Sequence, residues 1–153
     1  MGDLTTNFSR KEFACQCGCG YDDIDSRVVV MAQTIREAVG APVRINSGCR
    51  CMKRNIDVGG VAIAASRDNP QRGVPGREGS NPSKRGGGDS YHALGKAADL
   101  SIDGSASKLY LIIKILWKEG RLPDLAYCKR YVNKNFVHID CGPKAVNIFA
   151  EGN

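Results

Sequence analysis

The spacing of apolar side chains along the chain predicts two helices. Between residues 25 and 39, valine, alanine and isoleucine recur at the spacing of one helical face, behind an Asp25 or Ser26 cap and before Gly40. A second apolar stripe begins behind a serine cap at position 105 or 107 and stops at Gly120, and we expect its Trp117 to pack in the core. Two amphipathic helices are therefore expected.

Other stretches have the composition of β-strands. Residues 43–46 alternate β-branched and polar side chains, and residues 97–102 have the composition of a buried strand. Residues 125–131 and 136–140 are predicted to pair as a hairpin through the four residues between them. Helices and strands in this mixed order argue for an α+β fold with an antiparallel sheet and flanking helices.

Chain length and one glycine-rich segment define the expected domain organisation. A chain of 153 residues has the size of one domain, and we assign residues 1–153 to it. Residues 66–89 contain six glycines, three prolines, three serines and two asparagines, with hardly any apolar side chain. This composition predicts a loop, and its length favours either an insertion or a lid that grips substrate.

Composition and charge limit the kinds of partner. The chain is 42% hydrophobic and 25% charged, and no apolar run approaches the roughly 18 residues that span a membrane. The N-terminus lacks the apolar segment of a signal peptide, so we expect synthesis in a cytoplasm and no membrane partner. A net charge of +6 favours a polyanion such as an anionic cell wall. No nucleic acid is expected, because the basic residues are not interleaved with aromatic residues as in a base-stacking surface.

The two histidines of the chain, His92 and His138, each lie close in sequence to a carboxylate. Small residues after His92 let the backbone turn tightly and return Asp99 towards it, whereas the strand period of two puts His138 and Asp140 on one face. Two imidazoles and one carboxylate satisfy Zn²⁺ and leave a fourth tetrahedral position for water, which is the arrangement of a catalytic site. The alternative is one loop histidine and one satisfied core histidine, with no metal.

The motifs around these residues resemble the M15 family of zinc peptidases, in the branch related to zinc D-alanyl-D-alanine carboxypeptidase. Three motifs carry the resemblance: S-x-H-x-x-G-x-A-x-D at 90–99, S-G-x-R at 47–50 and F-x-H-x-D at 136–140. The cysteine-rich opening at residues 13–20 is also similar to the start of this branch.

That resemblance implies a hedgehog/DD-peptidase-like fold and one zinc ion held by His92, Asp99 and His138. It also implies that Arg50 grips the substrate or steadies charge at the scissile carbonyl, and that Ser90 lies in the substrate site. A guanidinium suits this role because it can stabilise an oxyanion or bind a terminal carboxylate as a fork. For Arg50 the alternative is a surface arginine in a turn.

The general base is harder to place. Relatives in other branches have an acidic residue three positions before the last histidine ligand, where this chain has Asn135, which cannot take a proton. Asp140 is our candidate for the base because it shares a strand face with His138. Asp140 alternatively supports the zinc ligand or makes a structural hydrogen bond. Asp89 and Asp103 are further candidates that folding could bring to the site.

Seven cysteines are many for a chain of this size, and their odd number leaves at least one unpaired. Cys15, Cys17, Cys19 and Cys51 are candidates for a second, structural zinc site closed by thiolates. Reduced thiols or a disulfide are the alternatives, because C-x-C-x-C lacks the usual C-x-x-C spacing. The two cysteines that flank the C-terminal hairpin are expected to be core thiols.

Taken with the resemblance, these observations predict a monomeric zinc metallopeptidase that hydrolyses peptide bonds in bacterial peptidoglycan, of the D-Ala-D-Ala carboxypeptidase or endopeptidase type. Family habit and the basic charge favour a phage endolysin or a virion-associated hydrolase that acts on the wall after release. The alternative is a non-catalytic zinc-containing module of the same fold, which binds the cell wall or has a structural role in a virion.

Overall fold

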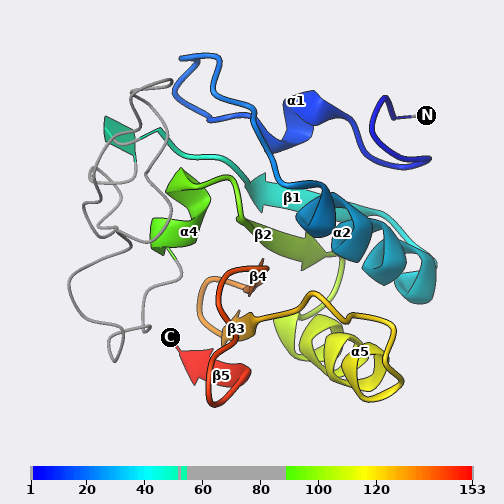
Figure 1. Cartoon of the computed structure of the whole chain (residues 1–153). Helices are drawn as coiled ribbons and strands as arrows, with labels where there is room; N and C mark the ends of the chain where they lie inside the picture. The colour runs from blue at the N-terminus through cyan, green and yellow to red at the C-terminus, as the bar shows by residue number, and fades with distance from the viewer. Residues whose placement is uncertain (1, 52, 55–88, 153) are drawn as a thin grey trace.

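The computed structural model describes residues 2–51, 53–54 and 89–152 (Figure 1). In chain order its elements are helices α1 (Arg10–Phe13) and α2 (Ser26–Val39), strand β1 (Val43–Ser47), helix α4 (Asp89–Ala93), strand β2 (Ala97–Ile102), helix α5 (Ala106–Lys118), and strands β3 (Tyr127–Tyr131), β4 (Phe136–Asp140) and β5 (Phe149–Gly152). Residues 66–88 of the predicted insertion loop lie outside the described residues, and residue 89 begins α4 rather than ending that loop.

The five strands form one sheet in the order β1-β2-β4-β3-β5. The first four strands in this order are antiparallel neighbours, as predicted. The sheet is nevertheless mixed rather than wholly antiparallel, because β5 pairs with β3 in parallel. The sequence of β5, Phe-Ala-Glu-Gly, has no alternation of apolar and polar residues, so nothing local marked it as a strand. The α+β class is confirmed, with this correction at one edge of the sheet.

Helix α2 begins and ends where capping chemistry predicts. The side chain of Asp25 accepts a hydrogen bond from the N–H of Arg27 at 2.9 Å, which satisfies one of the free donors of the first turn. At the other end Gly40 adopts the left-handed conformation with φ 68°, and its N–H donates to the Arg36 carbonyl. The predicted span of this helix is therefore confirmed to within one residue.

Helix α5 has two caps, one of them from the turn between β3 and β4. Ser105 Oγ accepts from the N–H of Lys108 at 3.2 Å, and Asn135 Oδ1 accepts from the N–H of Ala106 at 2.7 Å. Nδ2 of Asn135 also donates to the Gly104 carbonyl at 3.1 Å. Asn135 itself has φ 53°, a left-handed conformation that asparagine tolerates better than most residues. The turn is thereby fixed to the start of α5.

Helices α2 and α5 pack against each other, and α5 also packs on strands β2, β3 and β4 (Figure 1). Fully buried aliphatic side chains from both helices and from the sheet fill the space between them, among them Ile35, Leu100, Leu109, Ile113 and Ile139. Burial of each such side chain contributes about 1.5–3 kcal/mol to stability. This core covers one face of the sheet, and the polar site residues of β2 and β4 extend from the opposite face.

Trp117 does not lie in this core, contrary to the sequence prediction. Its side chain is 37% exposed and packs edge-to-face on Phe149, with 5.4 Å between ring centroids. Phe149 belongs to β5, a strand that was not predicted, so the contact of Trp117 with this strand was not predicted either.

Among the described residues no helix is long and apolar enough to cross a membrane.

Strand register brings distant parts of the sequence together at β2. In the β2–β4 pair Asp99 lies opposite His138. In the β1–β2 pair the register shifts between Ile45 and Ser47, so that Ser47 also lies opposite Asp99. Irregular pairing of this kind is common beside active sites because it re-aims the chain that follows. Here it directs the turn that contains Arg50 towards Asp99.

Candidate metal centre

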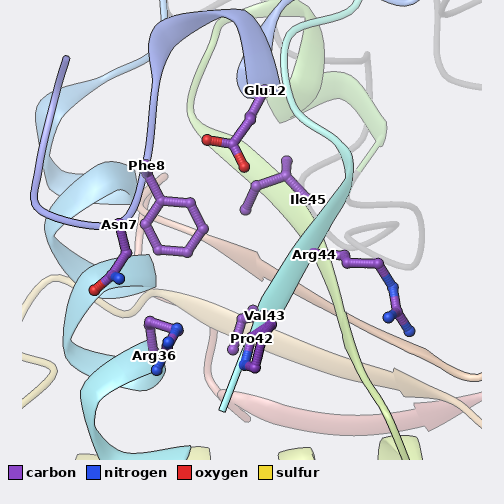
Figure 2. Close-up of a pocket in the computed structure, with 8 residues that line it drawn as sticks. All are labelled: Asn7, Phe8, Glu12, Arg36, Pro42, Val43, Arg44 and Ile45. Carbon is purple, nitrogen blue, oxygen red and sulfur yellow. The ribbon is translucent and has the colours of Figure 1, made fainter. Parts of the chain in front are cut away.

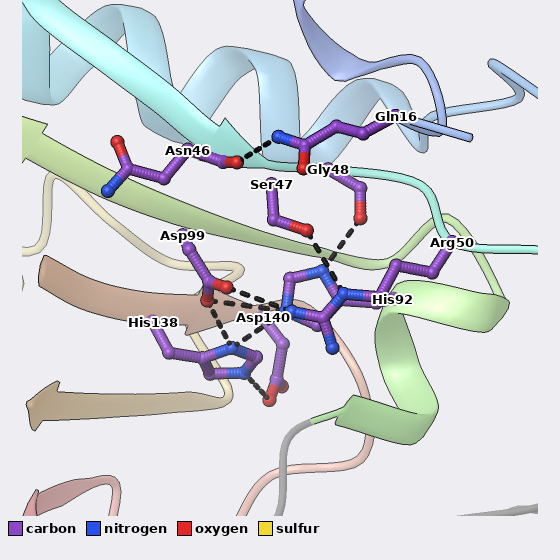
Figure 3. Close-up of polar contacts among 9 residues, drawn as sticks. All are labelled: Gln16, Asn46, Ser47, Gly48, Arg50, His92, Asp99, His138 and Asp140. Atoms are coloured by element: carbon purple, nitrogen blue, oxygen red, sulfur yellow. Dashed lines mark hydrogen bonds and ion pairs between the residues drawn. The ribbon is translucent and has the colours of Figure 1, made fainter. Parts of the chain in front are cut away.

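Three side chains from three elements converge at this point of the sheet (Figure 3). His92 comes from α4, Asp99 from β2 and His138 from β4, and all three are buried. Nε2 of His92 lies 3.2 Å from Nδ1 of His138, and Asp99 Oδ1 lies 3.0 Å from the same nitrogen. The distance from Asp99 Oδ1 to His92 Nε2 is 3.3 Å. The structure thus brings together all three predicted metal ligands.

Gly48 fixes the orientation of the His92 ring. Nδ1 of His92 lies 2.7 Å from the Gly48 carbonyl oxygen, and because a carbonyl can only accept, Nδ1 carries the proton and donates it. A ring held in this way directs Nε2 towards Asp99 and His138. A side chain at Gly48 would collide with the backbone of Phe13, since a Cβ there would lie 2.6 Å from the Phe13 carbonyl oxygen. Glycine therefore permits the close approach that positions this carbonyl.

The tight return from His92 to Asp99 depends on Gly95. This residue has φ 70°, and its N–H donates to the His92 carbonyl at 3.2 Å. A Cβ at this position would collide with the carbonyl oxygen of Asp23. Both the conformation and the lack of space require glycine, so the predicted reason for the small residues after His92 is confirmed at this position.

Asp140 fixes the orientation of the His138 ring. Its Oδ2 lies 3.1 Å from Nε2 of His138, while its Oδ1 accepts from the Gly142 N–H at 3.2 Å. An ionised carboxylate can only accept, so Nε2 carries the proton and Nδ1 faces Asp99 and His92. A histidine that donates its outer N–H to a carboxylate is the usual arrangement around a ligated metal.

The three ligand atoms fit a tetrahedral zinc ion. Donor atoms about 2.0 Å from such an ion lie about 3.3 Å from one another. The sides of the observed triangle are 3.0, 3.2 and 3.3 Å. Two imidazole nitrogens and one carboxylate oxygen are also the donor set of catalytic zinc sites. Geometry and chemistry therefore agree that His92, Asp99 and His138 can hold this metal.

Arg50 holds the other oxygen of Asp99. Its Nη2 donates to Asp99 Oδ2 at 3.1 Å, its Nε donates to Ser47 Oγ at 3.0 Å, and its backbone N–H donates to the His92 carbonyl at 3.0 Å. The side chain is buried, so the alternative of an arginine on the surface does not apply. In this structure Arg50 braces two of the metal-binding residues.

The electrostatics of the cluster favour a bound cation. Burial by itself raises the pKa of Asp99, but the charge and hydrogen bonds of His92 and His138 lower it well below its usual range. Burial opposes protonation of His138, but hydrogen bonds to Asp140 and Asp99 outweigh it and raise the pKa of the imidazole to about 9. Without a metal, His138 therefore holds a proton at the position where a metal would bind.

Other residues considered for catalysis lie elsewhere. Asn135 uses its side-chain amide to cap α5, and Asp103 is exposed and pairs with Arg44 at 2.7 Å. Both oxygens of Asp140 are hydrogen-bonded, one to the outer nitrogen of His138, which matches the supporting role more closely than that of a base. The side chains of Asp89 and Ser90 lie outside the described residues.

Two supporting groups were not predicted as functional. The carbonyl of Gly48 and the hydroxyl of Ser47 hold His92 and Arg50, respectively. The S-G-x-R motif pointed to this turn, but a backbone carbonyl leaves no chemical mark in a sequence. Only the folded chain shows which of its backbone groups meets a ring nitrogen.

A second group of potential metal ligands contains Cys15, Cys17, Cys19 and Cys51, whose sulfur atoms all lie within 4.8 Å of one another. These are the four cysteines singled out in the sequence. Cys128 and Cys141 are both buried, as expected for core thiols.

A pocket of about 520 Å³ lies at the start of β1, between the N-terminal segment and α2 (Figure 2). It is lined by Asn7, Phe8, Glu12, Arg36, Pro42, Val43, Arg44 and Ile45. None of these residues belongs to the metal-ligand triangle or to the groups that orient it. This pocket is therefore separate from the candidate metal centre.

Comparison with known proteins adds one finding. The family model described as Peptidase M15 matches residues 6–67, a segment that includes Arg50 and all four clustered cysteines but precedes His92, Asp99 and His138. No curated protein matches the chain. Over this segment, about two fifths of its length, the chain is similar to the peptidase M15 family.

Proposed function

We propose that this chain is a zinc metallopeptidase that hydrolyses peptide bonds in the stem peptides of bacterial peptidoglycan. The observation that carries the proposal is the triangle of His92 Nε2, Asp99 Oδ1 and His138 Nδ1, with sides of 3.0 to 3.3 Å. Each imidazole in it has its outer nitrogen occupied by an acceptor, so both inner nitrogens point to one place. Such a site suits metal-assisted hydrolysis.

Each residue of the site then has a distinct role. Zinc, when bound, would act as a Lewis acid that polarises a peptide carbonyl and lowers the pKa of a water molecule to about 7. His92, Asp99 and His138 hold the metal, Asp140 orients His138, and Arg50 orients Asp99. Arg50 also remains our candidate for binding substrate, because its guanidinium lies directly beside a metal ligand.

The substrate assignment rests on sequence. The three motifs that resemble zinc D-alanyl-D-alanine carboxypeptidase support a wall peptide, cleaved by carboxypeptidase or endopeptidase action. A net charge of +6 would favour adsorption to an anionic wall. Both features also suit a phage endolysin or a virion-associated hydrolase, which is the setting we propose.

One observation favours a second candidate, a non-catalytic zinc-containing module of the same fold. The Asn135 amide is engaged in capping α5, and both oxygens of Asp140 are hydrogen-bonded within the protein. Neither side chain stands ready to take a proton from water. A protein of this kind would bind wall peptides, or stabilise a virion, without turnover.

Digestion of purified peptidoglycan separates the two candidates. Zinc-loaded protein is incubated with walls of several chemotypes beside a chelated sample, and released fragments are read by mass spectrometry. New peptide termini that disappear with chelator would support the peptidase and identify its bond. Intact muropeptides in every wall type, together with retention of the protein on the walls, would favour the binding module.

Two variants make the result specific to the site. His138→Ala removes one ligand and should abolish both the metal at this centre and hydrolysis. Asp103→Asn is the matched control, because it removes a carboxylate that is exposed and paired with Arg44. The control should keep full activity, and hydrolysis retained by His138→Ala would remove His138 from the site.

A further inference from the structure

Four thiols from two separate segments meet beside the Arg50 turn. Cys15, Cys17 and Cys19 lie in the loop between α1 and α2, whereas Cys51 follows β1. The sulfur of Cys17 lies 3.4 Å from that of Cys15 and 3.6 Å from that of Cys51. All four sulfur atoms lie within 4.8 Å of one another. None of them is in a disulfide, and these separations exceed the roughly 2.05 Å of an S–S bond.

These separations suit a tetrahedral thiolate site. Zinc bonded to four sulfur atoms at about 2.3 Å holds them about 3.8 Å apart. The two measured separations are slightly shorter than this value, and the 4.8 Å limit allows all six to reach it with small movements. The unusual C-x-C-x-C spacing is no obstacle, because the fourth sulfur comes from a distant part of the chain.

Backbone N–H groups donate to two of the four sulfur atoms. The N–H of Cys51 donates to Cys15 Sγ at 3.4 Å, and the N–H of Arg54 donates to Cys51 Sγ at 3.4 Å. Donors aimed at sulfur stabilise a thiolate more than a thiol, because the anion is the stronger acceptor. Such donors are the supporting contacts that a metal-thiolate site requires.

We propose that Cys15, Cys17, Cys19 and Cys51 bind one zinc ion in a structural site with no open position. Four thiolates close the tetrahedron, so this site supports the fold and does not act on substrate. The proposal is independent of the proposed peptidase activity, because it concerns different ligands and needs no turnover.

The position of this site links the N-terminal segment to the metal centre. Gln16, within the cysteine loop, donates to the Asn46 carbonyl (Figure 3). The N–H of Cys49 donates to the Phe13 carbonyl at 2.7 Å. Cys51 is the neighbour of Arg50, whose guanidinium holds Asp99. Zinc at the four thiols would therefore fix both sides of the turn that braces the other centre.

The test uses the full chain with the other centre disabled. His138→Ala protein is purified under reducing conditions and its zinc content measured, and its zinc environment is read by X-ray absorption. We expect one zinc per chain with four sulfur neighbours at about 2.3 Å. Replacement by cobalt should give the intense thiolate-to-cobalt charge-transfer band of a tetrahedral sulfur site.

Matched cysteine variants assign the ligands. In the same His138→Ala chain, Cys51→Ala should lose the cobalt band and the bound zinc, whereas Cys128→Ala removes a buried thiol outside the cluster and should keep both. Cys17→Ala is the second variant in case Cys51→Ala fails to fold, because Cys17 is exposed and its loss disturbs no core packing. Absence of zinc from the reduced His138→Ala chain, nitrogen or oxygen neighbours around that zinc, or an unchanged band in Cys17→Ala would each overturn the proposal.

Discussion

Asp140 accepts a hydrogen bond from the outer nitrogen of His138 at 3.1 Å, and so determines which nitrogen of that ring faces Asp99 and His92. The two residues lie on one face of β4, two positions apart, and both are buried. Because the second oxygen of Asp140 is held by the Gly142 N–H, the carboxylate cannot turn without breaking a contact. The orientation of a metal ligand is thus determined by its own strand.

Replacing Asp140 tests whether it orients His138 or acts as a base. We expect Asp140→Ala to weaken zinc binding about 10- to 100-fold, the usual effect of losing such a partner. Asp140→Asn should weaken it less, because the amide oxygen still accepts from Nε2–H. Zinc affinity is measured by competition with a chromophoric chelator, and hydrolysis is measured at saturating zinc. Activity that stays lost in Asp140→Asn after zinc saturation would instead indicate a role in proton transfer.

Replacing Arg50 tests the ion pair with Asp99. Arg50→Ala leaves a buried carboxylate without its cation, so we expect a loss of about 3 kcal/mol in the free energy of unfolding of the metal-free protein. Arg50→Lys keeps the charge but lacks the forked guanidinium that reaches both Asp99 and Ser47. Its free energy of unfolding should lie between those of the parent and Arg50→Ala. Urea unfolding followed by far-UV circular dichroism gives these values. Equal stability of all three proteins would contradict the bracing role.

Asn135 should prove structural rather than catalytic. Asn135→Ala removes the cap on the Ala106 N–H and places alanine at φ 53°, so we expect a loss of about 1–2 kcal/mol of stability. Hydrolysis per folded molecule should stay unchanged. Asn135→Asp keeps an acceptor for the same N–H and should be close to the parent in stability. A marked gain of activity in Asn135→Asp would show that an acid at this position reaches the reaction after all.

The raised pKa of His138 predicts a pH dependence for the metal-free protein. The folded-state pKa of about 9 exceeds the ordinary value of 6.5, so protonation of His138 favours the folded state. This contribution is complete below pH 6.5 and is lost as the pH rises through about 9. Thermal unfolding of chelated protein across this range should show a falling Tm that the His138→Ala variant lacks. A Tm that rises between these two pH values in the chelated parent would be the contrary result.

Most of the regular structure could be predicted because its signals are local. The cap Asp25 marked the start of α2 and Gly40 marked its end, and alternation marked β1 and β4. The strand β5 and the surface position of Trp117 could not be predicted, because both involve a tertiary contact, the one between Trp117 and Phe149. That contact joins a helix to a strand more than thirty residues away in sequence.

The residues with metal-ligand chemistry could be found in the sequence: His92, Asp99 and His138, with the cysteines as a second group. The way in which they are used depends on how the chain folds. In the folded chain, Nε2 of His92 and Nδ1 of His138 face the metal position. Asp140 hydrogen-bonds to His138, Arg50 to Asp99, and Asn135 to the start of α5. Cys51 lies beside the N-terminal cysteines. The physical reason is that hydrogen-bond direction depends on strand register and on backbone groups far apart in sequence. Neither the register nor the position of these backbone groups can be read from residue identity alone.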